Sequence, residues 1–257
     1  MKTFVFDLDG TMYRGNAIIE SAKSFLDICY EKRIPYLFLT NNSMRTPEEN
    51  TKHMLDMGYE HIKPSMFYNS AMASCQYVKK ISKQRKAYYI GQNGIRSALE
   101  EEGFEITNEN PDFVFVGLDK QGTYDAYSKA LTHLLHGAKL IGTNKDRVLA
   151  KPDGFEIGNG SIIAMLEYAS EQESPAIAKP NRAMLDLFLD YFHLKKDDII
   201  LVGDNLETDI RLGFENDVKT IFVQTGVHSK DDIERFKIYP DYCFDSMMDF
   251  EMLNLLY

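Results

Sequence analysis

Apolar runs along this chain alternate with segments in which hydrophobic residues recur at helical spacing. The run Phe4-Val-Phe6 predicts a short buried strand. Residues 19–30 then carry apolar side chains on one helical stripe, and residues 35–40 form a second buried run that ends in Thr-Asn-Asn. Strands that alternate with helices in this way predict an α/β fold of parallel sheets joined by right-handed crossovers.

The alternation continues through the rest of the chain. Thr46-Pro-Glu-Glu49 is a capping box with proline at the first helical position, and it predicts a helix start. Further strands are predicted at residues 87–90, 113–117, 139–142, 198–203 and 219–224, with helices at residues 95–102 and 124–135 and from Leu206.

Acidic residues follow two of these strands at the point where each strand ends. Asp7 and Asp9 come after the first strand, and Asp204 comes after Leu201-Val-Gly203, with Asp209 in the helix that follows. Because ligands of open α/β sheets bind at the carboxyl ends of the strands, the fold can gather these carboxylates. Neighbouring carboxylates repel unless a cation or a shared proton balances them, and ligation by oxygen alone favours Mg²⁺.

A hydroxyl, two amides and an ammonium come from other strand and helix ends. Thr40, Asn41 and Asn42 follow the second strand, and Lys179 precedes Pro180, where we expect a helix to start. Together with the acidic residues they indicate a phosphate cradle beside a hard cation. Each signal alone also fits ordinary structure, namely an acidic turn, an asparagine turn, a helix start or a helix cap.

Composition narrows the function classes. A chain of 257 residues allows one large or two modest domains, and 44% hydrophobic residues are ample for a core. The formal net charge of −10 opposes a nucleic-acid partner, and three widely spaced cysteines do not indicate a disulfide framework. With no signal-peptide pattern and no long apolar run, we expect a cytoplasmic protein without a membrane partner.

The order of these motifs resembles a known family. Asp7-Leu-Asp9-Gly-Thr, Thr40-Asn-Asn, Lys179-Pro and Gly203-Asp204 with Asp209 are similar to the four motifs of the haloacid dehalogenase superfamily of phosphohydrolases. The match runs from residue 4 to beyond residue 209. It also resembles the NagD-like sugar phosphatases related to p-nitrophenyl phosphatases, through Leu39-Thr-Asn-Asn-Ser, Asn69-Ser-Ala-Met-Ala, Pro111-Asp-Phe-Val-Phe-Val-Gly, Gly142-Thr-Asn-Lys-Asp146 and Gly203-Asp-Asn-Leu-Glu-Thr-Asp.

The resemblance implies roles for the acidic residues. Asp7 would be the nucleophile that becomes an aspartyl phosphate, and Asp9 would be the general acid and base. Mg²⁺ would be held by Asp7, by the main-chain carbonyl of Asp9 and by Asp204. Asn205 and Asp209 would orient these ligands or the metal-bound water.

The resemblance also implies how phosphate is held. The Thr40 hydroxyl and the backbone N–H groups of Asn41 and Asn42 would bind phosphate oxygens. Lys179 would neutralise both the nucleophile and the phosphoryl group. Because phosphoryl transition states are loose, positioning and charge neutralisation would carry most of the catalysis.

The long segment between the second and third motifs predicts an inserted domain. We expect a doubly wound, Rossmann-like core at residues 1–77 and 179–257 and an α/β cap domain of the C2 type at residues 78–178. Thr143, Asn144 and Asp146 follow a cap strand and are candidate contacts for the leaving group, although an ordinary solvated loop fits them equally well. The glycine-rich residues 154–160 fit neither dinucleotide nor Walker spacing and predict a cap-to-core loop.

Three function classes fit such a site. The first is a Mg²⁺-dependent phosphatase acting on a small phosphorylated metabolite, such as a sugar or acid-sugar phosphate. The others are a phospho-acceptor signalling module and a catalytically silent phosphate-binding module on the same type of fold. Asp9 and the long insertion oppose the signalling module, and the intact set Asp7, Asp9, Lys179 and Asp204 opposes the silent one. A homo-oligomer formed through the cap is compatible with the sequence.

Overall fold

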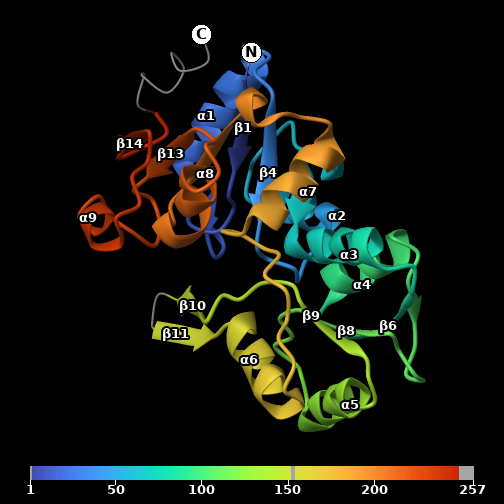
Figure 1. Ribbon diagram of the computed structural model, residues 1–257. Helices are drawn as coiled ribbons and strands as arrows, with labels where there is room; N and C mark the ends of the chain where they lie inside the picture. Colours follow the sequence, from blue (N-terminus) through green and yellow to red (C-terminus); the bar gives the residue numbers. More distant parts are fainter. Residues whose placement is uncertain (1, 152–153, 249–257) are drawn as a thin grey trace. The chain divides into compact units, whose positions relative to one another are not determined.

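A computed structural model describes residues 2–151 and 154–248 (Figure 1). Internal contacts divide the chain into two units. The first consists of Met1–Thr40, Glu48–Tyr68 and Phe188–Tyr257, and the second of Asn41–Pro47 and Asn69–Leu187. The parts of the predicted domains at residues 1, 152–153 and 249–257 lie outside the described residues.

The first unit is built around a parallel sheet with strand order β14-β13-β12-β1-β4-β5. Its central strand β1 (Thr3–Phe6) pairs in parallel with β12 (Ile199–Gly203) and with β4 (Tyr36–Thr40). On the far side of β12 the parallel pairing continues through β13 (Thr220–Val223) to β14 (Tyr242–Phe244), whereas β5 (Phe67–Asn69) lies next to β4. The chain therefore extends this sheet in opposite directions on the two sides of β1. Open α/β folds bind ligands at the carboxyl ends of the strands that flank such a reversal, here β1 and β12.

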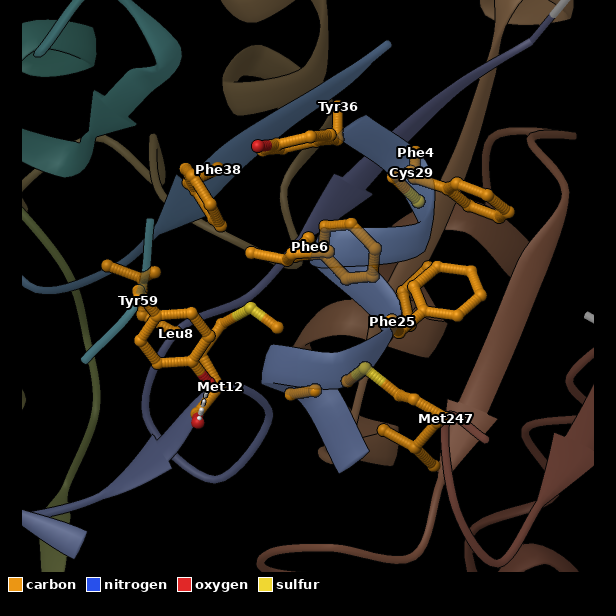
Figure 2. Close-up of a cluster of buried hydrophobic side chains, with 14 of the residues drawn as sticks. Phe4, Phe6, Leu8, Met12, Phe25, Cys29, Tyr36, Phe38, Tyr59 and Met247 are labelled. Carbon is orange, nitrogen blue, oxygen red and sulfur yellow. Dashed lines mark hydrogen bonds between the residues drawn. The ribbon is translucent and has the colours of Figure 1, made fainter. Parts of the chain in front are cut away.

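Aromatic packing fixes the position of β1. The helix α1 (Glu20–Glu31) buries one stripe of side chains, as its spacing predicted, and Phe25 of this stripe packs edge-on against Phe4 and Phe6 of β1 at ring-centroid distances of 5.3 Å and 6.0 Å. Figure 2 shows this cluster together with Phe38 of β4. The apolar run that predicted the strand is thus the centre of the first unit's core.

Shorter elements complete the first unit. The Tyr59 hydroxyl donates to the main-chain oxygen of Met12 and ties down the loop after β1 (Figure 2). The elements are β2 (Tyr13–Arg14), β3 (Ala17–Ile18), α2 (Pro47–Asp56), α8 (Arg211–Phe214), α9 (Asp232–Phe236), two 3₁₀ turns (Pro64–Met66 and Lys196–Asp198) and one π-helical turn (Leu206–Ile210). The helix α7 (Arg182–Phe192) is divided between the units: its residues up to Leu187 belong to the second unit and those from Phe188 to the first.

The second unit has its own parallel sheet with strand order β7-β6-β8-β9. Its core joins Ile90, Val114 and Leu140 of the sheet with Leu134 and Ile163 of two helices. The strands are β6 (Lys86–Ile90), β7 (Glu105–Ile106), β8 (Phe113–Val116) and β9 (Lys139–Gly142), and the helices are α3 (Ser70–Ile81), α4 (Asn93–Glu101), α5 (Tyr124–Leu135) and α6 (Asn159–Ser170). Both units confirm the predicted α/β class with parallel sheets.

Two local predictions are wrong. Residues 154–160 do not form a connecting loop: β11 (Gly154–Ile157) pairs antiparallel with β10 (Val148–Lys151), and α6 begins at Asn159. The helix predicted to have Pro180 or Asn181 in its first turn begins instead at Arg182. The backbone N–H and the side chain of Asn181 both donate to the main-chain oxygen of Ala178, in the turn before the helix.

The boundaries of the cap, residues 78–178, stay a prediction. All described residues of this range belong to the second unit, which also contains residues 41–47 and the whole of α3. Among residues 2–151 and 154–248, no helix combines the length and apolar character that crossing a membrane requires.

Candidate active site

Three carboxylates converge at the carboxyl ends of β1 and β12. Asp7 directly follows β1 and Asp204 directly follows β12, while Asp209 lies in the π-helical turn Leu206–Ile210. One carboxylate oxygen from each of the three lies within 4.8 Å of the others. The central strands therefore bring together acidic residues that are separated by about two hundred positions in sequence.

Both oxygens of Asp204 are held by hydrogen bonds. The Thr11 hydroxyl donates to Oδ1 at 2.7 Å, and the backbone N–H of Val227 donates to Oδ2 at 2.7 Å. A Cβ at Gly10 would lie 2.4 Å from Oδ2, and one at Gly226 would lie 1.9 Å from the same atom. Two glycine backbones thus enclose the carboxylate and fix its orientation.

The surroundings of Asp204 disfavour its charged form. Burial, then the neighbouring carboxylates of Asp7 and Asp209, raise the pKa of Asp204 to about 7, against the opposing hydrogen bonds from Thr11 and Val227. A cation bound among these side chains would remove the repulsion and favour the charged form. Because all three side chains offer carboxylate oxygens, which are hard ligands, the cluster fits a hard divalent cation.

The turn that carries Asp209 is fixed by its own side chains. Asp209 Oδ2 accepts the backbone N–H of Asn205 at 3.2 Å, and Asn205 Oδ1 accepts the N–H of Glu207 at 2.9 Å. A Cβ at Gly203 would overlap the Asp209 side chain at 2.3 Å. The Asp209 side chain is therefore held in place beside Asp7 and Asp204, and it is not simply an exposed side chain on a helix.

Asp9 and Thr40 complete the predicted residues of the first unit. Asp9 is exposed in the tight turn after β1, where the Gly10 N–H donates to the main-chain oxygen of Tyr13 at 2.7 Å. The Thr225 hydroxyl donates to the main-chain oxygen of Gly10 at 2.7 Å and holds the other side of this turn. Thr40 is the last residue of β4 and is buried.

A second group of predicted residues is joined by hydrogen bonds within the second unit. Asn41 Oδ1 accepts the Lys179 N–H at 3.0 Å, and Asn41 Nδ2 donates to the Lys179 main-chain oxygen at 3.1 Å. The same Nδ2 lies 3.3 Å from Asp146 Oδ1, and Asn144 Nδ2 donates to the Asn41 main-chain oxygen at 2.9 Å. Lys179 is buried, with 5% of its surface exposed.

The remaining predicted residues also belong to this unit. Thr143 is fully buried, and its hydroxyl donates to Ser43 Oγ at 3.0 Å. Asn144 is also buried, so the solvated-loop interpretation is wrong for these two residues. Asn42 Oδ1 accepts the Met44 N–H at 3.0 Å and forms the predicted asparagine turn.

Sequence reasoning missed two residues that hold Asp204 and a third beside them. Thr11 belongs to the Gly-Thr turn that the motif contained, so its side chain was within reach of prediction. Val227 contributes a backbone N–H, for which residue type gives no signal. His228 accepts the Leu206 N–H through Nδ1 at 3.1 Å and follows no recognisable pattern.

Comparisons with known families cover most of the chain. Residues 4–105 match haloacid dehalogenase-like hydrolases, and residues 176–250 match a HAD-hydrolase-like family. An acid sugar phosphatase of Staphylococcus haemolyticus is 37% identical over 247 residues, which cover 96% of this chain and 94% of that protein.

Solved structures give the same result. A 4-nitrophenylphosphatase from Thermotoga maritima has a TM-score of 0.91 at 28% identity and covers 100% of this chain and 98% of its own. NagD from E. coli K-12 has a TM-score of 0.88 at 31% identity and covers 97% of this chain and 98% of its own.

Proposed function

Because the chain belongs to the haloacid dehalogenase superfamily, in its NagD-like subgroup, and is a phosphatase, we propose that it hydrolyses a phosphomonoester of a small metabolite with the help of Mg²⁺. The observation that carries the proposal is the convergence of Asp7, Asp204 and Asp209 at the ends of two adjacent parallel strands. A sugar or acid-sugar phosphate is the proposed substrate class, since a relative covering nearly the whole chain is named as an acid sugar phosphatase.

Mg²⁺ would be held by Asp7, by the main-chain carbonyl of Asp9 and by Asp204, with Asp209 and Asn205 orienting these ligands. When bound, the ion would supply positive charge that neutralises phosphoryl oxygens. The raised pKa of Asp204 supports this assignment, because a carboxylate that is costly to ionise alone is stabilised by a cation.

The Asp7 carboxylate would attack phosphorus, so that a P–O bond to Asp7 forms while the bond to the leaving oxygen breaks. Asp9 would donate a proton to that leaving oxygen. In the second half-reaction Asp9 would take a proton from water as the water attacks the aspartyl phosphate, releasing inorganic phosphate and regenerating Asp7. The exposed position of Asp9 in its turn is compatible with proton exchange with water.

The phosphoryl group would be oriented by the Thr40 hydroxyl and the backbone N–H groups of Asn41 and Asn42. Lys179 would neutralise its charge, a role supported by the two hydrogen bonds with which Asn41 holds the Lys179 backbone. A rigid backbone reduces the motion of the side chain that it carries, and small displacements of a charged group are costly in phosphoryl transfer.

Specificity would come from the cap, proposed as residues 78–178. Of its candidate contacts, Asp146 would reach the leaving group, while Thr143 and Asn144 are buried and would support this turn through Ser43 and Asn41. Closure over the site would exclude water. We place the enzyme in the cytoplasm. A homo-oligomer through the cap is compatible with this assignment.

Phosphate release from a panel of phosphorylated metabolites tests the proposal. The panel should include sugar phosphates, acid-sugar phosphates, nucleotides and p-nitrophenyl phosphate, each with Mg²⁺ and with EDTA. We expect Mg²⁺-dependent turnover of at least one sugar-type monoester and none by Asp7→Asn, which serves as the control for contaminating phosphatase. Wild-type turnover that survives EDTA, or that does not exceed the turnover of the Asp7→Asn preparation, would contradict the mechanism.

A further inference from the structure

Three consecutive backbone N–H groups next to Asp204 are each bound by a different side chain. The Asn205 N–H donates to Asp209 Oδ2, the Leu206 N–H to His228 Nδ1, and the Glu207 N–H to Asn205 Oδ1, at 3.2, 3.1 and 2.9 Å. N–H groups at the start of a helical turn lack partners within the turn. Two of these acceptors belong to the segment itself, and His228 is the acceptor that comes from outside it.

His228 makes two hydrogen bonds with the main chain of this segment. Its backbone N–H donates to the main-chain oxygen of Asp204 at 3.4 Å, while its Nδ1 accepts the Leu206 N–H. The preceding residue, Val227, donates to the Asp204 carboxylate. Residues 227 and 228 therefore hold the carboxylate of Asp204, its main chain and the start of the turn that carries Asp209.

The imidazole is fixed in the orientation that this contact needs. The His228 side chain is 11% exposed, and its ring packs edge-on against Phe236 with centroids 4.9 Å apart. Because Nδ1 accepts a hydrogen bond, it carries no proton, and a neutral ring places its proton on Nε2. Nε2 lies 4.0 Å from Glu207 Oε2.

We propose that His228 is a positioning residue for the divalent-metal site. It fixes the main chain between Asp204 and Asp209, so that both carboxylates keep their positions around the ion. This inference rests on the proposed function, since it assumes that the acidic cluster binds Mg²⁺. Groups that orient metal ligands typically change metal affinity by about tenfold or more when removed, although they do not touch the ion.

Matched substitutions isolate the Nδ1 contact. In His228→Asn, the amide Oδ1 occupies the place of Nδ1 along the side chain and can accept the Leu206 N–H. In His228→Gln, the carbonyl oxygen lies one atom further out, and in His228→Ala no acceptor remains. Thermal unfolding in EDTA should first show which variants are folded. Mg²⁺ binding to the metal-free proteins is then measured by calorimetry, and exchange of the Leu206 amide hydrogen by NMR.

We expect His228→Ala and His228→Gln to weaken Mg²⁺ binding about tenfold or more and to speed Leu206 amide exchange. His228→Asn should stay within about threefold of the wild type in both measurements. At saturating Mg²⁺, the kcat of each variant should lie closer to the wild-type kcat than its Mg²⁺ affinity lies to the wild-type affinity. Equal Mg²⁺ affinity in the wild type and His228→Gln, or equally weak binding by His228→Asn and His228→Ala, would overturn the inference. Wild-type protein that does not bind Mg²⁺ would instead overturn the proposed metal site on which it rests.

Discussion

The side-chain amide of Asn41 hydrogen-bonds to both main-chain polar groups of Lys179. Oδ1 accepts the Lys179 N–H at 3.0 Å, and Nδ2 donates to the Lys179 carbonyl at 3.1 Å. The Asn41 amide thus makes the pair of hydrogen bonds with Lys179 that the backbone of a neighbouring β-strand would make. The backbone of a predicted phosphate-binding lysine is fixed by the residue that follows the end of β4.

Replacing Asn41 by alanine should therefore impair catalysis through Lys179. We expect kcat to fall by about 10- to 100-fold, because a small displacement of a charged group is costly when it neutralises a transition state. Steady-state kinetics with the best substrate of the panel would measure the loss.

A matched control is Asn181→Ala. It removes a side-chain hydrogen bond to Ala178 in the same turn without touching the Lys179 backbone polar groups. This variant should retain kcat within about threefold of the wild type. Equal losses in the two variants would indicate a general disturbance of the turn and not a specific effect on Lys179.

Asp204→Asn should separate stability from metal binding. In EDTA the variant should unfold at a higher temperature than the wild type, since it removes one charge from the cluster that raises the pKa of Asp204 to about 7. Each kcal/mol relieved corresponds to roughly 2–4 °C for a chain of this size. Calorimetric scans with Mg²⁺ should show the wild type unfolding at the higher temperature, because the ion stabilises only the wild type. A metal-free variant less stable than the wild type would contradict the repulsion argument.

Gly226→Ala should distort the Asp204 site, because its Cβ would lie 1.9 Å from Asp204 Oδ2. Overpacking of this kind typically costs about 1–3 kcal/mol, and here it also displaces a proposed metal ligand. Urea unfolding and Mg²⁺ titration should both show a loss. Gly15→Asn is a suitable comparison, since a Cβ at Gly15 meets nothing within 4 Å and its φ of +61° suits asparagine. Comparable losses in the two variants would count against the close approach as the cause.

Protonation of His133 should make the second unit less stable in mild acid. Burial, then Lys129 and His136, lower the pKa of His133 below 6.5, and within the described residues its Nε2 is buried without a hydrogen-bond partner. The unfolded chain therefore takes up the proton first as pH falls. The contribution of neutral His133 is complete above about pH 6.5 and is lost as pH falls through the lower folded pKa.

The expected result is a smaller loss of unfolding free energy between about pH 7.5 and pH 5 in His133→Gln than in the wild type. Urea titrations at several pH values would measure it. His193→Asn removes an exposed histidine at a positive φ, which asparagine tolerates, and serves as the control. An unchanged pH dependence in His133→Gln would rule out His133 as its source.

The sequence predicted the longer elements because their hydrophobic period is unambiguous. The helix at Tyr124–Leu135 and the strand at Lys139–Gly142 have the predicted bounds. The β10–β11 hairpin escaped prediction because the residues of β11 (Gly154–Ile157) are all exposed and begin with glycine. Strands of two residues, such as β7 (Glu105–Ile106), are too short to show a period.

The acidic cluster was predictable for a different reason. Asp7 and Asp204 follow strands that pair in parallel, so their convergence follows from topology. The contacts that orient Asp204 were not predictable to the same degree. Val227 acts through its backbone, and the role of His228 depends on a loop after β13 returning to the turn after β12. Such returns are decided by packing, which leaves no local pattern of residue types.

Thr11 and Val227 each occupy one oxygen of Asp204. A carboxylate oxygen that already accepts one hydrogen bond has one in-plane lone pair left, so each oxygen of Asp204 can offer a cation one further bond. The hydrogen bonds from Thr11 and Val227 therefore decide which side of the carboxylate faces a bound cation.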